Sequence, residues 1–570
     1  MSHDPWTDLR IRADEVRKTI ERDLGVRSPG ALAEAPEGKG LFAIAAFPYA
    51  KDLRQPPADI ARRAARTEAP APFVPLVAEG PYVNLVADPP AFATHVLSSV
   101  ATMGESYGRS PRRSERVLLE HTSVNPTGPI HVGRARNPIY GDSLARVLDL
   151  AGYDLTREYL VNDVGKQMVL QYWAAKHLKP EDVPPPDVDK EDFRLVKYYQ
   201  KATALLEAKP ELNEEVIGLI QQFERGDATL TRGIRAVSER VLGGILQTLS
   251  RIDVTYDSFF WESDLILDGS VQAVIERLKP LSRAEDGAHY LDLKAFGLEG
   301  DAAKYFFVTR HGTSLYTTRD IAYHLNKKTR CDVAINVLGE DQKLSFQRLK
   351  AAFQLMGIDW TPETIFYAFV GLPEGRMSTR KGRVVNLDDL IDEAVERAYL
   401  EVSKRRADLP EEKKRAIAEI VGVGAVRFNI VRVQAEKRIL FRWEEALNFE
   451  GTSGPFLQYA HARACGILDK ADSTVKGDPA RLVHPAEQRL LRWTAKFPST
   501  IREAAETRRV HAVGSFVSEF ASVFNEFYRD CPVLSAEPSL RQARLTLVDV
   551  ARVVLQNGLG CLGLKAPREM

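Results

Sequence analysis

The sequence predicts a multidomain α/β protein with a parallel β-sheet at its centre and a long helical C-terminal part. Three observations support this prediction. The chain has 570 residues, which is too long for a single hydrophobic core. A strand, a crossover helix and a second strand, the unit of a parallel sheet, are indicated within residues 116–163. From about residue 386 to the end, the hydrophobic spacing is almost entirely helical.

The composition is that of an ordinary globular protein, with 44% hydrophobic and 27% charged residues. Basic and acidic residues both number 78, so any nucleic-acid binding must depend on where the positive charge lies. The N-terminus is polar, and no apolar run reaches the roughly 18 residues of a membrane helix. We therefore expect a cytoplasmic protein that does not bind membranes.

Four cysteines occur in the chain, and none form a C-x-x-C pair. Each lies in an apolar segment, which predicts free thiols in the core. The sequence indicates neither a zinc site nor a disulfide framework.

The first unit, residues 1–108, is predicted to be a small α+β domain. It begins with a helical pattern that contains Leu9, Ile11, Val16 and Ile20. Strand-like runs follow at 41–47 and 81–87. A basic helix is expected between them at 59–66, and by itself it is more typical of a solvated face than of a binding site.

The second unit, residues 109–385, carries the predicted parallel sheet. An apolar run at 116–123 leads through the loop 124–129 into a helix that Gly152 ends. Strand candidates follow at 156–163 and 332–339, and the second precedes another helical stretch. Between about 170 and 255 the pattern becomes polar and helical, which indicates an insertion.

The sequence NPTGPIHVGRARN (125–137) places a Pro/Gly turn between a predicted strand and a helix that starts near His131. Backbone N–H groups at such a helix start favour anions, and Gly133 permits close approach of a nucleotide. His131 and Arg134 are then expected to face phosphates. A single histidine in this position is more often structural than catalytic.

A second basic segment, GRMSTRKGRVV (375–385), lies far along the chain, and Gly375 and Gly382 bracket most of it. Its cations, next to Ser378 and Thr379, are suited to closing over a triphosphate. Taken alone, the segment is more typical of a basic surface loop.

Together the two segments resemble the HIGH and KMSKS signatures of class I aminoacyl-tRNA synthetases, in the expected order. HVGR (131–134) is similar to the first and RMSTR (376–380) to the second. The resemblance implies ATP contacts at these residues: His131, Gly133, Arg134, Arg376, Met377, Ser378, Arg380 and Lys381. Catalytic roles are expected for four of them: His131, Gly133, Arg134 and Lys381.

The chain departs from both signatures. Arg134 replaces the second histidine of HIGH, and Arg376 and Thr379 replace the two lysines of KMSKS. Arg134 and Lys381 are the expected substitutes, because each provides a cation near the position of the missing one.

Selection of an amino acid needs a further site. A guanidinium group is planar and permanently charged, so a pocket for arginine needs carboxylates that can bind it in a bidentate manner. Glu120 precedes the HVGR loop, and Tyr316 and Asp320 share one face of a predicted helix. Asp320 alone is more typical of an ordinary charge at a helix start.

The segments 120–167 and 314–324 resemble arginyl-tRNA synthetases over their full length. The resemblance implies that Glu120, Tyr316 and Asp320 contact the guanidinium. It assigns the α-carboxylate and α-amino groups of arginine to Asn125 and Gln342. The floor of the pocket is assigned to a further set: Asn162, Asp163 and Gln167.

The segments 452–468, 523–534 and 544–570 are similar to the helical anticodon-binding domain of that family, and the first unit is similar to its N-terminal tRNA-contacting domain. The matching base contacts are Tyr528 and Met570. Tyr459 is a third candidate, and its segment is equally typical of a core helix. We expect Gly558 and Gly560 to turn the chain back after the last helix, so that its end lies against the bundle.

The resemblance implies a Rossmann-like class I catalytic domain (109–385) with a helical insertion at about 170–255, between an N-terminal domain (1–108) and an all-α anticodon-binding domain (386–570). The expected activity is ATP-dependent activation of L-arginine and its transfer to tRNA(Arg). Mg²⁺ is expected to arrive with ATP, zinc is not expected, and a monomer is expected.

Three alternatives remain at this point. A synthetase for another amino acid is disfavoured. The class I enzymes for cysteine and methionine commonly carry Cys-rich zinc sites, and those for isoleucine, valine and leucine carry a large editing domain. Neither feature has a counterpart in this sequence. A non-catalytic nucleic-acid-binding homologue stays open because of Arg134 and Thr379. A small-molecule nucleotidyltransferase is disfavoured by the long helical C-terminal part.

Overall fold

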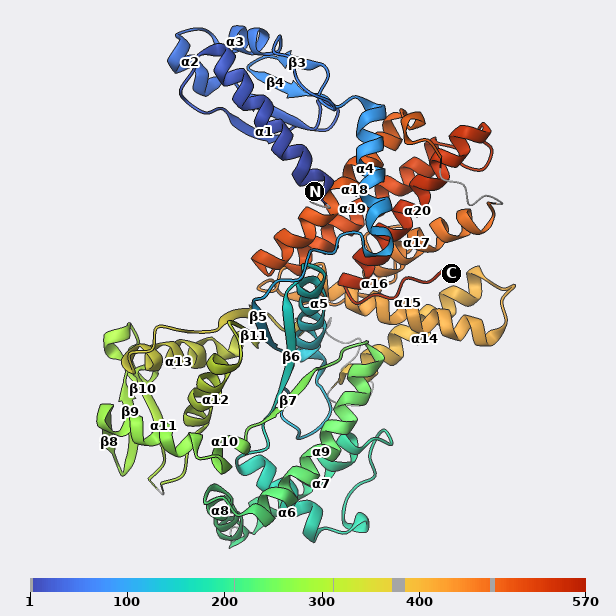
Figure 1. Cartoon of the computed structure of the whole chain (residues 1–570). Coiled ribbons are helices and arrows are strands. Elements are labelled where there is room, and N and C mark those ends of the chain that lie inside the picture. The colour runs from blue at the N-terminus through green and yellow to red at the C-terminus, as the bar shows by residue number, and fades with distance from the viewer. Residues whose placement is uncertain (1–3, 210, 311, 372–384, 472–476) are drawn as a thin grey trace. The chain divides into compact units, whose positions relative to one another are not determined.

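The computed structural model describes residues 4–570 except 210, 311, 372–384 and 472–476. The chain divides into two compact units, each described by itself (Figure 1). The first combines Met1–Pro111 with Asn448–Met570, and the second comprises Arg112–Leu447. The two ends of the sequence therefore share one unit.

The N-terminal part of the first unit is an α+β domain, as predicted. Its sheet is antiparallel with the order β1-β2-β4-β3. Its elements are α1 (Pro5–Leu24), β1 (Ala31–Glu34), β2 (Phe42–Ala45), α2 (Phe47–Leu53), α3 (Pro57–Ala64), β3 (Leu76–Glu79) and β4 (Tyr82–Leu85). Leu9 and Ile20 are buried on one face of α1, whereas Ile11 is 54% exposed. The inclusion of Ile11 in the apolar pattern is wrong, because residues two apart in a helix face different sides.

The remainder of the first unit is helical. Its elements are α4 (Pro89–Met103), η1 (Gly104–Ser106), α17 (Gly454–Asp469), η8 (Pro479–Arg481), α18 (Pro485–Thr507), α19 (Val510–Asp530) and α20 (Pro538–Cys561). Helix α18 packs on α19, and α17 packs on α20. Three of the four cysteines lie in this helical part, and all four are buried and free, as predicted.

The chain turns after α20 at a different glycine from those expected. Gly558 and Gly560 lie inside α20, which continues to Cys561, so the prediction that they turn the chain is wrong. The left-handed residue is Gly563, with φ of 70°. Gly558 serves packing instead, because a Cβ there would lie 2.6 Å from a Val517 methyl group on α19.

The second unit is built on a five-stranded sheet with the order β12-β11-β5-β6-β7. All neighbouring strands are parallel, which confirms the prediction. The strands are β5 (Arg116–Glu120), β6 (Asp154–Val161), β7 (Ser258–Trp261), β11 (Val333–Gly339) and β12 (Glu363–Tyr367). Because the strands are parallel, their carboxyl ends meet at one edge of the sheet, where α/β proteins bind ligands.

Helices connect these strands. The crossover helices are α5 (Arg136–Leu150), α12 (Tyr316–Arg330) and α13 (Lys343–Leu355). The helical insertion between β6 and β7 is confirmed and consists of α6 (Lys166–His177), η3 (Pro180–Asp182), α7 (Glu191–Ala208), α8 (Glu211–Glu224) and α9 (Ala228–Arg251). Its helices pack around a core of their own that includes Val169, Trp173 and Ile234. Figure 1 shows them as one group next to β7.

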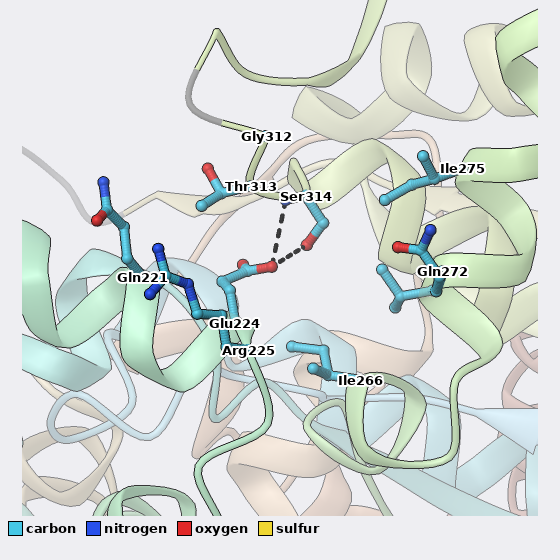
Figure 2. Close-up of a pocket in the computed structure, with 10 residues that line it drawn as sticks. Gln221, Glu224, Arg225, Ile266, Gln272, Ile275, Gly312, Thr313 and Ser314 are labelled. Atoms are coloured by element: carbon cyan, nitrogen blue, oxygen red, sulfur yellow. Dashed lines mark hydrogen bonds between the residues drawn. The ribbon is translucent and has the colours of Figure 1, made fainter.

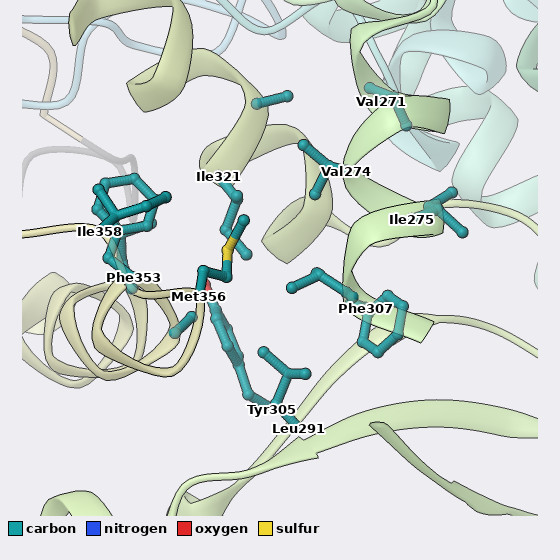
Figure 3. Packing of buried hydrophobic residues seen from close by; sticks show 14 of the residues in the cluster. Val271, Val274, Ile275, Leu291, Tyr305, Phe307, Ile321, Phe353, Met356 and Ile358 are labelled. Atoms are coloured by element: carbon teal, nitrogen blue, oxygen red, sulfur yellow. The ribbon is translucent and has the colours of Figure 1, made fainter. Parts of the chain in front are cut away.

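A small sheet between β7 and α12 was not predicted. Three antiparallel strands have the order β10-β9-β8, and two helices precede them. The elements are α10 (Asp264–Leu267), α11 (Ser270–Leu278), β8 (Ser282–Glu285), β9 (Ala288–Asp292) and β10 (Lys304–Val308). Figure 3 shows Tyr305 and Phe307 of β10 packed with Ile321 of α12 and Phe353 of α13. This core packs against α12, which carries Tyr316 at its first position and Asp320 one turn later.

The second unit ends with helices and two short strands. These are β13 (Val370–Gly371), α14 (Leu387–Arg405), α15 (Glu411–Val431), β14 (Ile439–Leu440) and α16 (Trp443–Ala446). Arg427 of α15 forms an ion pair of 2.5 Å with Asp142 of α5, and neither side chain is exposed. Helix α15 is thereby joined to the crossover helix of the sheet. The sequence-based domain limits assign α14 and α15 to the C-terminal domain, and that functional division stays a prediction.

Candidate active site

The HVGR element stands at the carboxyl edge of the sheet, one loop after β5. Residues Val132–Arg134 form the short helix η2, which leads directly into α5. The backbone N–H of Gly133 donates to Nδ1 of His131 at 3.0 Å. Nδ1 is therefore an acceptor, so the neutral ring carries its proton on Nε2 and can donate from there. Burial, together with the nearby Arg134 cation, lowers the pKa of His131 from 6.5 and favours this neutral form.

Arg134 is half-exposed on the same turn. Its guanidinium lies 3.3 Å from Asp341 and 5.6 Å from the centre of the Phe369 ring. Asp341 belongs to η7 (Glu340–Gln342), which directly follows β11. Arg134 is therefore held near the end of a second strand, next to Gln342.

Both flanks of the second basic segment lie next to the HVGR element. The N–H of Val132 donates to the carbonyl of Val385 at 3.0 Å, and the N–H of Leu387 donates to Ile130 at 2.8 Å. On the other flank, a Cβ at Gly133 would lie 3.7 Å from the Val370 carbonyl. The residues expected to bind ATP from this segment lie outside the described residues: Arg376, Met377, Ser378, Arg380 and Lys381.

Arg136 fastens the start of α5 to the strand that leads into this segment. The side chain is fully buried, and its guanidinium donates to the carbonyls of Ala368 at 3.2 Å and Val433 at 3.0 Å. Burial lowers the pKa of Arg136 to about 10, so the group stays cationic at neutral pH. Backbone carbonyls replace the water that its charge would otherwise require.

Tyr316 and Asp320 lie one turn apart at the start of α12, as predicted. The Asp320 carboxylate is also 3.2 Å from Nδ1 of His324. Three carboxylates raise the pKa of Tyr316, with Asp320 the strongest, followed, after burial, by Glu262 and Glu120. Negative charge from three separate elements therefore converges on the Tyr316 ring.

Glu262 was missed by the sequence analysis. It directly follows β7, as Glu120 ends β5, so its position at the carboxyl end of a parallel strand is the signal that could have identified it. It is 2% exposed, and Oε1 accepts from Nε of Arg319 at 2.9 Å. Its Oε2 has no hydrogen-bond partner among the described residues. Burial raises the pKa of Glu262 to about 6, although the Arg319 cation opposes the shift.

Glu120 is buried with a partner already in place. Its carboxylate forms an ion pair with Lys327 of α12 and accepts from the hydroxyl of Ser123 at 3.0 Å. Burial opposes ionisation, but Lys327 outweighs it and lowers the pKa of Glu120. Glu120 is therefore ionised at neutral pH.

The other residues predicted to form the arginine pocket each follow a strand of the parallel sheet. Asn125 is exposed in the loop after β5, where its carbonyl accepts from the N–H of Thr127 at 2.7 Å. Gln342 ends η7 after β11. Asp163 is buried and accepts two hydrogen bonds from Ser263, at 2.9 Å and 2.6 Å, so it supports the residue after Glu262.

Arg319 connects the first turn of α12 to the helical insertion. Its guanidinium lies 3.5 Å from Glu224 at the end of α8, and it donates to the Ser314 hydroxyl at 3.0 Å. Figure 2 shows Glu224 accepting from both the N–H and the hydroxyl of Ser314, at the wall of a cavity of about 140 Å³. The insertion is thereby fixed to the residues that precede Tyr316.

In the first unit, the predicted base contacts Tyr459 and Tyr528 are 41% and 43% exposed. The Arg463 guanidinium lies over both rings, 4.8 Å and 5.2 Å from their centres. Met570 lies at the end of a tail that packs on α17, because His461 contacts the Pro567 carbonyl at 2.9 Å. The expected packing of the chain end against the bundle is confirmed.

Two kinds of feature are absent from the described residues. No helix within them is both long and apolar enough to cross a membrane. They also contain no group of three or more His, Cys, Asp and Glu side chains that could hold a metal ion.

A parallel sheet with the HVGR turn after its first strand, and with the described flanks of a basic segment next to that turn, defines the catalytic domain of a class I aminoacyl-tRNA synthetase. Residues 96–443 match the family model "tRNA synthetases class I (R), catalytic domain", and residues 457–570 match the DALR anticodon binding domain. The chain belongs to the arginyl-tRNA synthetase family.

Individual relatives agree with this assignment. The arginine–tRNA ligase of Methanocella arvoryzae is 48% identical over 528 residues, which cover 92% of each chain. That of Methanothermobacter thermautotrophicus is 42% identical over 568 residues, 98% of each chain. The solved Thermus thermophilus arginyl-tRNA synthetase has a TM-score of 0.80 and 28% identity, with 99% of this chain and 100% of that chain covered. The resemblance and the fold class inferred from the sequence are confirmed, and attachment of arginine to tRNA is the activity of the family.

Proposed function

We propose that this chain performs the family reaction, with the acidic centre around Tyr316 as its arginine pocket. One observation carries the proposal: ion pairs from α12 to Glu120 at the end of β5 and to Glu262 after β7 hold Tyr316 and Asp320 at the carboxyl edge of the sheet. A guanidinium ion fits such a centre, because it is a permanent planar cation with five N–H donors.

Each residue of the pocket has a role in this proposal. Asp320 and Glu120 accept from the guanidinium, and the Tyr316 hydroxyl completes its hydrogen bonding. Asn125 and Gln342 hold the α-carboxylate and α-amino groups. The guanidinium is then held from β5 and α12, and the α-carboxylate and α-amino groups are held from the loops after β5 and β11, which orients the carboxylate toward ATP.

ATP occupies the HVGR side of the same edge in this proposal. Nε2–H of neutral His131 donates to a phosphate oxygen, Gly133 admits the nucleotide, and Arg134 supplies positive charge. The segment with Arg376, Met377, Ser378, Arg380 and Lys381 closes over the phosphates. Its flanks lie next to Val132 and Gly133, which supports this role.

The chemistry proceeds in two steps. A carboxylate oxygen of arginine attacks the α-phosphorus of ATP, the bond to the β-phosphate oxygen breaks, and pyrophosphate leaves. The terminal 2′-hydroxyl of tRNA then attacks the carbonyl carbon of arginyl-adenylate and gives up its proton. The bond from that carbon to the bridging anhydride oxygen breaks, and AMP leaves with this oxygen. Neither step needs an enzyme nucleophile, so His131 and the basic residues act by positioning and by stabilising charge on the phosphoryl oxygens. Mg²⁺ enters with ATP as part of that substrate, and zinc has no part.

The first unit binds tRNA in this proposal. Tyr459 and Tyr528 offer exposed rings for stacking with splayed bases, and Met570 adds an adaptable apolar contact. The domain at 1–108 contacts tRNA, and the domain at 386–570 reads the anticodon. We further propose that the protein is a cytoplasmic monomer.

Pyrophosphate exchange tests the proposal. Of the amino acids, only arginine should support exchange of labelled pyrophosphate into ATP. The exchange should also require tRNA, as is typical of this family. Exchange with lysine or another amino acid, or its absence with arginine, ATP and tRNA together, would overturn the proposed substrate.

A further inference from the structure

Two consecutive residues after β5 have a backbone conformation that their side chains disfavour. Thr122 has φ of 70° and Ser123 has φ of 43°. This left-handed region is uncommon outside glycine and asparagine, and it is least favourable for a β-branched residue such as threonine. Such a conformation persists only where surrounding contacts impose it.

Asn137 makes those contacts from the first turn of α5. Its Oδ1 accepts from the N–H of Thr122 at 2.7 Å, and its Nδ2 donates to the carbonyl of Thr122 at 3.4 Å. One buried amide thus pairs with both polar backbone groups of the disfavoured residue. Its Nδ2 also donates to the Val337 carbonyl of β11 at 3.1 Å.

The turn at Thr122 and Ser123, which Asn137 holds, lies between two residues proposed to bind arginine. Glu120 lies two positions before Thr122, and Asn125 lies two positions after Ser123. Within the turn, the Ser123 hydroxyl donates to Glu120 at 3.0 Å and accepts from the N–H of Leu160 at 3.1 Å. A change in the backbone at Thr122 would therefore displace both a carboxylate and an amide of the pocket.

We propose that Asn137 is a positioning residue for arginine: it imposes the left-handed turn at Thr122 and Ser123 and ties it to β11. This inference rests on the proposed function of Glu120 and Asn125. Through Val337 the clamp also fixes the distance from the turn to the end of β11, which leads to Gln342. Asn137 touches no substrate in this proposal.

Removal of the Asn137 side chain should raise the KM for arginine much more than the KM for ATP. The assay is tRNA-dependent pyrophosphate exchange. Asn137→Ala should raise the arginine KM at least about tenfold, because small displacements of positioning groups have large kinetic effects. The ATP KM should change less than about twofold. Asn137→Asp should be as harmful, since a carboxylate cannot donate to the two carbonyls. Asn326→Ala is the matched control, an asparagine of α12 whose Oδ1 accepts from Arg330 at 2.7 Å.

A second-site change separates positioning from general stability. Glycine adopts positive φ without a Cβ penalty, so Thr122→Gly in the Asn137→Ala background should restore part of the arginine KM. If Asn137→Ala does not fold, Asn137→Ser, which keeps a shorter polar group, carries the same comparison. An unchanged arginine KM, or equal losses for arginine and ATP that Thr122→Gly does not relieve, would overturn the proposal. Asp320→Ala is measured in parallel: if it too leaves the arginine KM unchanged, the proposed pocket is wrong rather than the clamp alone.

Discussion

Glu120 and Lys327 form a buried ion pair that joins the carboxyl end of β5 to α12, and their side chains are only 7% and 0% exposed. Lys327 also donates to Oδ1 of Asn336 at 2.7 Å. The pair fixes the end of β5 against α12. Removal of either partner would leave the other charge buried and unpaired, which would lower the stability of the folded protein.

Lys327→Met should therefore destabilise the protein strongly. An unpaired carboxylate at Glu120 is expected to cost about 3–5 kcal/mol of the free energy of unfolding, which denaturant titration will measure. Lys328→Met is the control, because Lys328 is exposed on the same helix. The double variant Lys327→Met with Glu120→Gln should recover part of the loss, and a loss no greater than the control's would contradict this account.

Because of the Glu120–Lys327 pair, stability should depend on pH in opposite ways in the unsubstituted protein and in Lys327→Met. The pKa of Glu120 is lowered from 4.5 in the folded protein, so its contribution to stability is present above pH 4.5 and is lost as the pH falls through the lowered pKa. In Lys327→Met, burial alone should raise that pKa, and acidification should then reduce the destabilisation. Unfolding curves at several acidic pH values will distinguish the two trends.

Asp320→Ala should impair arginine use far more than stability. Leaving a desolvated guanidinium without its carboxylate costs about 3–5 kcal/mol, so kcat/KM for arginine should fall on the order of a hundredfold or more. The ATP KM should change little. Aminoacylation kinetics will test this, with the exposed Asp359→Ala as control, and near-normal values for Asp320→Ala would remove Asp320 from the pocket.

Glu262 should give arginine binding a pH dependence. Its folded pKa is raised from 4.5 to about 6, so its stabilising contribution is full below pH 4.5 and is lost as the pH rises through about 6. A bound guanidinium favours the ionised form, so the arginine KM should fall as the pH rises through about 6. Glu262→Gln should flatten this profile and Glu276→Gln should not, whereas an unchanged profile in Glu262→Gln would exclude Glu262 as its source.

His131→Ala should lower kcat more than it raises the ATP KM. Loss of one such phosphate donor typically costs about 2.7–4 kcal/mol in the transition state. Burial and Arg134 lower the pKa of His131 from 6.5, so activity that depends on the neutral ring should persist at pH 6.5 and decline below it. Arg134→Met should move that decline toward pH 6.5. Steady-state kinetics as a function of pH will show whether the decline moves, and a decline that stays in place would separate His131 from Arg134.

Deletion of residues 566–570 should weaken aminoacylation mainly through the tRNA KM. The deletion removes Met570 and the contact of 2.9 Å between His461 and Pro567, while the buried helix α20 remains. Arginine and ATP KM values should hardly change. Titration of tRNA at one fixed salt concentration is the measurement, since nucleic-acid affinity depends on salt. Arg568→Ala, which removes only the exposed pair with Asp469, is the control. Equal tRNA KM values for the full-length and shortened proteins would withdraw the role of the chain end.

The sequence by itself determined the family, the parallel sheet and the helical character of the C-terminal part. The βαβ pattern predicted the parallel sheet, and the spacing on α12 placed Tyr316 and Asp320 on one face. These features are local, because periodicity and turn residues act within a few residues of one another.

Only the tertiary structure decided which distant groups meet. Glu262 joins Asp320 and Glu120 because parallel strands bring their carboxyl ends to one edge, a register that no local pattern encodes. The small sheet β8–β10 escaped prediction because its short strands are stabilised by packing against α11–α13 more than by their own propensity. The hydrogen bonds from Asn137 to Thr122 could not be predicted either. They form only when the fold has brought the start of α5 next to the end of β5.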